Sequence, residues 1–85
     1  MEIIWKDRRY GGAEANVAGG FIKLVVHRPI LAKGQDEYYE VFINQLKMKR
    51  VFNDVNVAKS IAEVALATKM RQALKELGIV VGETA

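Results

Sequence analysis

Hydrophobic and polar residues alternate with a period of two along much of the first half of the chain, which predicts β-strands. The alternation is clear over residues 13–17, 21–28 and 37–44, and a shorter segment, residues 48–52, repeats it. Residues 1–5 alternate more weakly and are expected to form a short edge strand. Because the segments follow one another closely, a meander of three to four antiparallel strands is the simplest arrangement.

Turn-forming residues separate these predicted strands. The pair Gly19-Gly20 predicts a two-residue hairpin of type I′, because both central positions of that turn need a positive φ. Pro29 is expected to end the second strand, since proline cannot donate a hydrogen bond to a sheet. We expect further turns at residues 6–9, which are all charged, and at residues 45–47, with a loop over residues 30–35.

Residues 54–78 follow a different pattern, which predicts one long C-terminal helix. Asp54 is a favourable N-cap, Gly78 is a favourable C′ residue, and no Pro or Gly lies between them. Ile79 is expected to make the apolar contact that accompanies a Schellman motif. At about 100° per residue, one apolar stripe should face the sheet. It comprises Val55, Ala58, Ala62, Ala65, Leu66, Met70, Ala73 and Leu77.

These elements together predict an α+β domain in which one helix covers one face of an antiparallel sheet. We expect a single domain over residues 1–85, with the sheet in 1–53, the helix in 54–78 and a tail in 79–85. The helix should be about 35 Å long and an eight-residue strand about 27 Å, so the end of the helix should overhang the sheet.

The two faces of the predicted sheet differ in character. The aliphatic face is expected to lie under the helix and carries Ile22, Leu24, Val26, Tyr39, Val41 and Ile43. The opposite, outer face carries Phe21, Lys23, Val25, His27, Tyr38, Glu40 and Phe42. A single helix cannot cover both faces, so we expect the outer face to be solvated, covered by a partner or used for binding.

The helix carries a second apolar strip nearly opposite the first. It consists of Val57, Ile61 and Val64, with Leu74 to one side. One interpretation is burial under a loop or under the N-terminal segment. The other is a self-association surface. Dimerisation would add stability to a chain of this size, because folding alone buries only about 60–65% of the surface of the unfolded chain.

Composition argues against several classes of function. The chain has no Cys and one His, so it offers no disulfide framework, no thiolate zinc site and no Cys nucleophile. Ser60 falls inside the predicted helix, where a catalytic triad is not expected. Asp36 and Glu37 are adjacent and would point apart in a strand, which does not suit an acid–base pair. We therefore predict a protein that is not an enzyme and binds no cofactor or metal.

The same composition bears on location. The apolar runs are too short to cross a bilayer, and the first residues do not show the pattern of a signal peptide. Together with the absence of Cys, this favours the cytoplasm and no membrane partner. The net charge of +3 permits nucleic-acid binding without requiring it.

Several residues together resemble a class of small, mostly uncharacterised phage and prophage proteins. The matching positions are Trp5, Tyr10, Ala13, Phe21, Tyr39, Val41 and the stretch FNDVNVAK over residues 52–59. The chain departs from that class at Asn56 and Val57, where acidic residues are usual. The resemblance implies a phage-encoded accessory or host-modulating protein in the cytoplasm of a bacterial host, but it implies no site. The order of sheet and helix is also similar to the single-stranded-DNA-binding coactivator fold.

Two functions fit these observations. The first is a protein-interaction module, most simply a homodimer with an unidentified further protein partner, whose candidate self-association residues are Val57, Ile61, Val64 and Leu74. The alternative is a module that binds single-stranded DNA or RNA through aromatic and basic residues. Its candidate residues are Phe21, Lys23, His27, Tyr38, Phe42, Lys47, Lys49 and Arg50, and the cluster Lys6, Arg8 and Arg9 is a second basic group.

Overall fold

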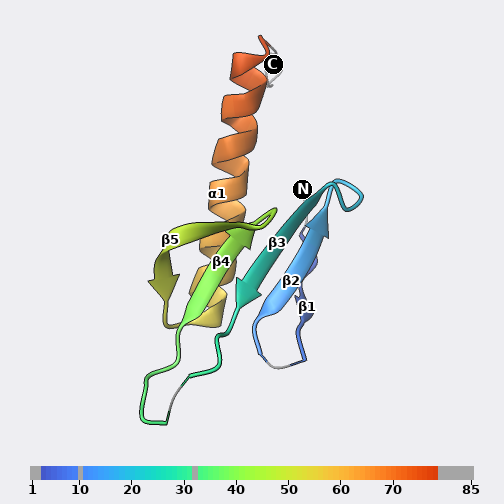
Figure 1. Cartoon of the computed structure of the whole chain (residues 1–85). Coiled ribbons are helices and arrows are strands. Elements are labelled where there is room, and N and C mark those ends of the chain that lie inside the picture. Colours follow the sequence, from blue (N-terminus) through green and yellow to red (C-terminus); the bar gives the residue numbers. More distant parts are fainter. Residues whose placement is uncertain (1–2, 10, 32, 79–85) are drawn as a thin grey trace.

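A five-stranded antiparallel sheet is crossed on one face by a single helix in the computed structural model of the chain, which describes residues 3–9, 11–31 and 33–78. The strands lie in the sheet in the order in which they occur in the chain. The elements are β1 (Lys6–Asp7), β2 (Ala13–Val17), β3 (Ile22–His27), β4 (Tyr39–Ile43), β5 (Leu46–Phe52) and α1 (Val55–Glu76). The predicted α+β class is confirmed, with one strand more than expected (Figure 1).

The extra strand lies where the sequence predicted a turn. Lys6 and Asp7 form β1 and pair with β2, so the prediction of a turn over residues 6–9 was wrong, and so was a strand at residues 3–5. Residues 1–2 of that predicted strand lie outside the described residues. The chain instead reverses just after β1, where the Arg8 amide donates to the Gly12 carbonyl over 3.2 Å. Gly12 has a φ of 78°, which an L-residue rarely adopts.

The hairpin between β4 and β5 is tighter than predicted. The turn is Asn44-Gln45, with φ values of 49° and 73°, and β5 begins at Leu46 rather than at residue 48. Asn tolerates positive φ, and here its contacts also hold it in place. The Asn44 side-chain oxygen accepts from the Lys23 backbone amide over 2.8 Å, and the Asn44 backbone amide donates to the Lys23 carbonyl over 2.9 Å. A turn of two residues is the commonest hairpin connection, and this one extends β5.

Strand β5 does not pair regularly along its whole length. Glu40 pairs with Val51 but Phe42 pairs with Lys47, so more residues of β5 than of β4 lie between these two pairs. Such a bulge bends the strand, and Figure 1 shows β5 curving around the base of the helix.

The Gly19-Gly20 prediction is confirmed in its essentials. Both residues have a positive φ, and the Phe21 amide donates to the Ala18 carbonyl across them over 3.2 Å. Ala18 also has a positive φ, and strand pairing starts at Val17 and Ile22. Phe21, predicted as the first residue of the strand, therefore lies in the turn, where it is 82% exposed.

Helix α1 begins and ends close to the predicted residues. The Asp54 carboxylate accepts from the amides of Asn56 and Val57 over 2.8 and 3.2 Å, as an N-cap does. At the other end, Gly78 has a φ of 77° and its amide donates to the Lys75 carbonyl, one of the two bonds of a Schellman motif. The contact predicted for Ile79 lies outside the described residues.

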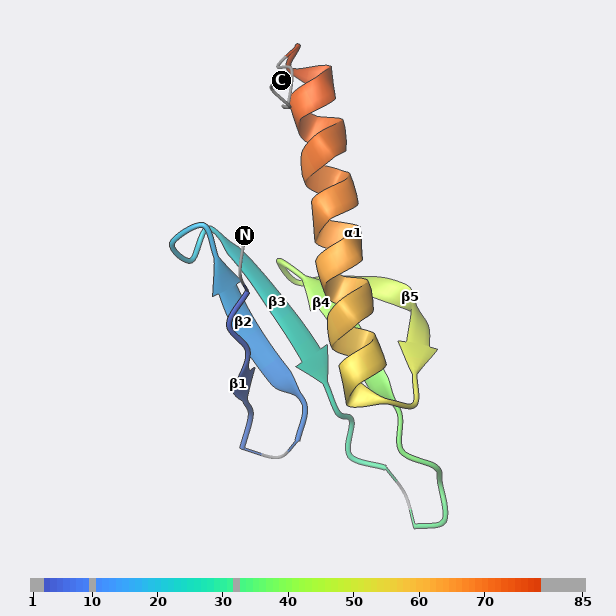
Figure 2. The same ribbon diagram turned by 180° about the vertical axis from the view of Figure 1, so that it is seen from behind.

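The core lies between the first half of the helix and the inner face of the sheet. Ala58 and Ala62 are fully buried and Leu66 nearly so, and the small alanines allow the helix to approach the strands closely. They pack on the predicted aliphatic face, where the buried side chains are Leu24, Val26, Val41 and Ile43. Figure 2 shows the helix lying across this face.

The N-terminal segment covers one flank of the helix. Ile3 and Trp5 pack against the buried core, and the Trp5 indole N–H donates to Glu63 Oε2 over 2.7 Å. The Lys59 ammonium lies 6.0 Å from the centre of the same ring, within range of a cation–π contact. This segment therefore fastens the start of the chain to the middle of the helix.

Candidate interaction surfaces

The outer face of the sheet carries one continuous row of side chains across all five strands. Strand register places Lys6, Glu14, Val25, Phe42 and Lys47 opposite one another in turn, from β1 to β5. With neighbouring strands roughly 4.8 Å apart, the row spans about 19 Å. Apolar residues occupy its centre and a lysine lies at each end.

A shallow hollow of about 540 Å³ lies on this face, a volume within the usual range of ligand sites. Its lining comprises Arg8, Lys23, Val25, His27, Phe42, Asn44 and Gln45. The rings of His27 and Phe42 have centroids 6.2 Å apart and are inclined at 74°, an edge-to-face pair. The hollow thus combines an aromatic and aliphatic floor with cationic groups at its rim.

The charges around the hollow are arranged in pairs. Glu14 is shared between two cations: Arg8 Nε lies 3.5 Å and Lys23 Nζ 3.6 Å from its oxygens. Lys47 Nζ lies 3.1 Å from Glu40 Oε2, and Arg28 pairs with Glu37 nearby. Because one carboxylate serves two cations at Glu14, that corner keeps an excess of positive charge.

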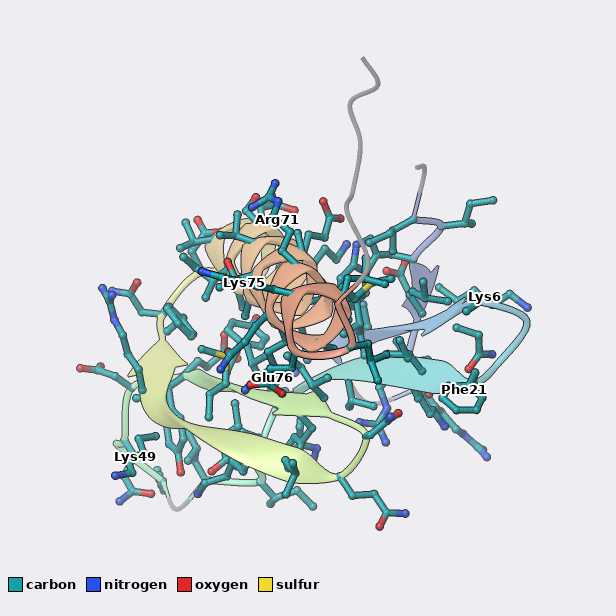
Figure 3. All side chains as sticks on the ribbon, turned by 90° about the horizontal axis from the view of Figure 1, so that it is seen from above. Lys6, Phe21, Lys49, Arg71, Lys75 and Glu76 are labelled. Atoms are coloured by element: carbon teal, nitrogen blue, oxygen red, sulfur yellow. The ribbon has the colours of Figure 1, made fainter. Side chains whose placement is uncertain are left out.

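The structure brings together some of the predicted nucleic-acid residues and separates the others. Lys23, His27 and Phe42 line the hollow, with Lys47 one strand further along. Lys47 is therefore not part of the lining, and the other four predicted residues also lie outside it: Phe21 at a hairpin tip, Tyr38 before β4, and Lys49 and Arg50 in the bulged part of β5. Figure 3 shows Phe21 and Lys49 at opposite sides of the sheet.

Arg50 also contacts the ring of buried Phe52, because its guanidinium carbon lies 5.2 Å from the centre of that ring. Conversely, the predicted residues omitted Asn44 and Gln45, and Arg8 was only part of a separate basic cluster. All three belong to turns, whose side-chain positions depend on the hairpin geometry and not on strand alternation.

The second half of α1 forms a different surface. We call residues 67–77 the overhang, because they follow Leu66, the last buried residue of the helix. None of them is buried, and Leu77 is 73% exposed. Figures 1 and 2 show the helix extending well past the end of the sheet, as predicted from its length. Arg71 and Lys75 lie on the side away from the sheet (Figure 3).

The apolar stripe of the helix does not stop where the sheet stops. Leu66 packs on the core, Met70 packs partly against its edge, and Ala73 and Leu77 continue the same line beyond it. No strand in the described part of the chain covers Ala73 or Leu77, and both are exposed. A surface that is apolar and continuous with the core is therefore left open to solvent.

The predicted self-association residues do not form one surface. Ile61 packs against the buried core beside Ala58 and Ala62. Val57 and Val64 are 49% and 62% exposed, but they lie about 10 Å apart along the helix without Ile61 between them at the surface. Leu74 is half-buried and belongs to the overhang. Single exposed valines are common on protein surfaces.

Among the described residues, no group of three or more His, Cys, Asp or Glu side chains is placed to hold a metal ion. Helix α1 is not apolar enough over its length to cross a membrane. Comparisons of the chain with protein-family models, curated proteins and solved structures found no match. The two surfaces described above therefore carry the functional argument.

Proposed function

We propose that this protein is a non-enzymatic interaction module that associates as a homodimer through the overhang. The observation that supports this most directly is the apolar stripe, which runs unbroken from the core into exposed helix. Exposed apolar surface of this kind commonly marks a protein interface. A second copy supplies a partner surface of the same apolar character.

The spacing of the stripe suits helix pairing. Leu66, Met70, Ala73 and Leu77 are separated by four, three and four residues, the spacing of alternating a and d positions in a coiled coil. Ala73 lies at the centre of the exposed part, where a small side chain allows two helices to approach closely. The overhang is about 16 Å long, enough for two helical turns of contact.

Charge complementarity favours an antiparallel pair. Lys69 and Glu76 precede Met70 and Leu77 by one residue each, so they lie on the same flank of the stripe. In two antiparallel helices related by a two-fold axis, equivalent flanks meet. Lys69 of each copy then faces Glu76 of the other, which gives two interhelical ion pairs.

This arrangement also brings the end of the second helix toward the end of the sheet. The β2–β3 and β4–β5 turns lie at the end from which the overhang leaves. Both carry large exposed apolar side chains, Phe21 and Leu46. A helix end returning antiparallel along the overhang would reach this region, so these side chains would become part of the dimer contact.

The affinity of such a dimer is expected to be modest. Burying Leu74 and Leu77 of both copies contributes at most about 8 kcal/mol, at roughly 2 kcal/mol for each fully buried side chain, since Leu74 is already half-buried. Association costs at least about 4 kcal/mol in lost translational and rotational freedom. The balance is about 4 kcal/mol at most, which corresponds to a Kd of roughly 1 mM, so protein concentrations into the low millimolar range must be examined.

Sedimentation velocity over that concentration range tests the proposal. The wild type should shift from monomer to dimer, and Ala73→Glu with Leu77→Glu should remain monomeric because four charges would then face one another. The control is Val57→Glu with Val64→Glu, which adds the same charge to the opposite side of the helix and should still dimerise. Circular dichroism checks that each variant is folded.

Two outcomes would contradict the overhang dimer. One is a wild type that stays monomeric throughout the range. The other is dissociation by the valine variant alone, which would move the interface to the residues predicted from the sequence. The phage or prophage origin and the bacterial host cytoplasm rest on the resemblance of residues such as Trp5 and Tyr39, and they stay predictions.

A further inference from the structure

We propose that the hollow on the outer face of the sheet binds a short segment of single-stranded nucleic acid, and that Glu14 competes with the phosphates for Arg8 and Lys23. This inference is independent of the dimer, because the hollow and the overhang lie on different parts of the molecule. It concerns residues that the strand register and the turns bring together.

The floor of the hollow provides a place for one base. Val25 and Phe42 are half-buried neighbours on β3 and β4, and His27 lies edge-to-face with Phe42. Because the two rings are inclined at 74°, a base lying flat can stack on only one of them. Stacking on an aromatic side chain is largely indifferent to base identity. We therefore expect one stacked base and little sequence preference.

The rim of the hollow provides phosphate contacts that are only weakly committed elsewhere. Arg8 and Lys23 each lie about 3.5 Å from a Glu14 oxygen, and all three side chains are between about a third and half exposed. Ion pairs so exposed contribute little to stability. A phosphate can therefore replace the Glu14 carboxylate at small cost. Both Arg8 and Lys23 are then available to bind the phosphate.

The length of the row of side chains from Lys6 to Lys47 favours a strand over a single nucleotide. Lys23 and Arg8 lie on one side of Phe42, and Lys47 lies on the other, one strand away. The whole row spans about 19 Å, which exceeds the distance between neighbouring phosphates of one strand. A strand running across the sheet would place successive phosphates near cations on both sides of the stacked base.

A single strand also suits the site better than a duplex. The bases of a duplex are stacked on one another, so none is free to lie on Phe42. An unpaired base can leave the stack at little cost. The asparagine at the rim, Asn44, is held by its two bonds to Lys23, so the edge of the hollow is formed before the ligand arrives.

Fluorescence anisotropy with a labelled 15-nucleotide oligothymidylate, at several salt concentrations, tests the proposal. Wild type should bind, with affinity falling as salt rises. Lys23→Ala should weaken binding and make the salt slope shallower by about 0.7, the change expected for one lost phosphate contact to a single strand. Its control, Lys75→Ala, removes the same charge from the overhang and should bind nearly as wild type.

Two further variants separate stacking from charge. Phe42→Leu keeps an apolar side chain but removes the ring, and should weaken binding about fivefold or more without changing the salt slope. Glu14→Gln should tighten binding about three- to tenfold, because the competing carboxylate is gone. Asp36→Asn makes the same charge change in the exposed connection between β3 and β4, away from the hollow and the overhang, and should tighten binding far less.

The results that would overturn the proposal are equally specific. They are no binding at low salt, equal binding of an oligothymidylate and of polyphosphate, tighter binding of duplex than of single strand, or identical affinities for Glu14→Gln and Asp36→Asn. Saturable binding of thymidine monophosphate with the affinity of the oligonucleotide would show a mononucleotide site and would also reject a strand. Thermal unfolding confirms that each variant is folded.

Discussion

The two halves of helix α1 have similar patterns and different surroundings. In the first half, Ala58, Ala62 and Leu66 are buried against β3, β4 and β5. In the second half, Ala73 and Leu77 continue the same stripe at the same helical spacing, and both are exposed. The sequence pattern alone does not distinguish them, since both halves are amphipathic and both lack Gly and Pro.

The difference arises from length. Helix α1 has 22 residues and measures about 33 Å, whereas the six residues of β3 extend about 20 Å. The sheet therefore covers only part of the stripe. An amphipathic pattern shows that a surface is suited to burial, and tertiary structure decides whether the same chain or another copy buries it.

The largest expected effect comes from introducing a charge into each half. Ala62→Glu places a carboxylate in the fully buried part of the stripe and should cost roughly 3–5 kcal/mol of unfolding free energy. Ala73→Glu is the matched change in the overhang and should shift stability by less than about 0.5 kcal/mol. Chemical denaturation of dilute protein measures both.

Equal destabilisation by Ala62→Glu and Ala73→Glu would show that the overhang is as fully packed as the first half, and the comparison would fail. A stable Ala73→Glu variant that no longer dimerises would instead sharpen it, because folding and association would then depend on different halves of one helix.

A smaller loss of stability is expected from a substitution at Gly12, in the turn between β1 and β2, which lies against the sheet under the first half of α1. A Cβ on Gly12 would lie 2.1 Å from the Val26 carbonyl oxygen, and Gly12 has a φ of 78°. Gly12→Ala should therefore displace the strand on which Ala58 and Ala62 pack and cost more than about 2 kcal/mol. Gly19→Ala is the control, since its φ is also positive but nothing lies within 4 Å of an added Cβ.

Thermal unfolding of these two variants separates backbone conformation from steric overlap. Gly19→Ala should cost about 1 kcal/mol, the lower end of the range for an L-residue held in the left-handed region. If both substitutions cost the same, contact with Val26 contributes nothing, and the sheet under the helix is more tolerant than its packing indicates.

The smallest effect concerns the residue at which the covered half begins. Asp54→Ala removes the acceptor for the amides of Asn56 and Val57 and should cost about 1 kcal/mol. Asp54→Asn keeps a capping oxygen and should be close to neutral. Urea denaturation resolves the two, and a large cost for the Asn variant would mean that the carboxylate charge, not the hydrogen bonds, stabilises this end.

Much of the fold followed from local pattern. The strict alternation in residues 22–27 and 39–43 separated inner from outer side chains correctly, because side chains of a strand point to opposite faces. The caps at Asp54 and Gly78 bounded the helix, because its terminal amides and carbonyls need partners that few residue types provide. The α+β class follows from these elements alone.

The errors occurred where local pattern was weak. The charged residues Lys6 and Asp7 have little β propensity, and they form β1 because β2 offers them an edge to pair with. The Asn44-Gln45 turn was displaced from its predicted position because the contacts of Asn44 with Lys23 hold it there.

The sequence by itself determined the class of the fold, the position of the helix and the faces of the central strands, because alternation, helical period and capping act over a few residues. Only the tertiary structure decided that Arg8 and Lys23 share Glu14 beside Phe42, and that the stripe is covered as far as Leu66 and open beyond it. The first depends on strand register and the second on the relative lengths of helix and sheet, and both join residues that are far apart in the chain.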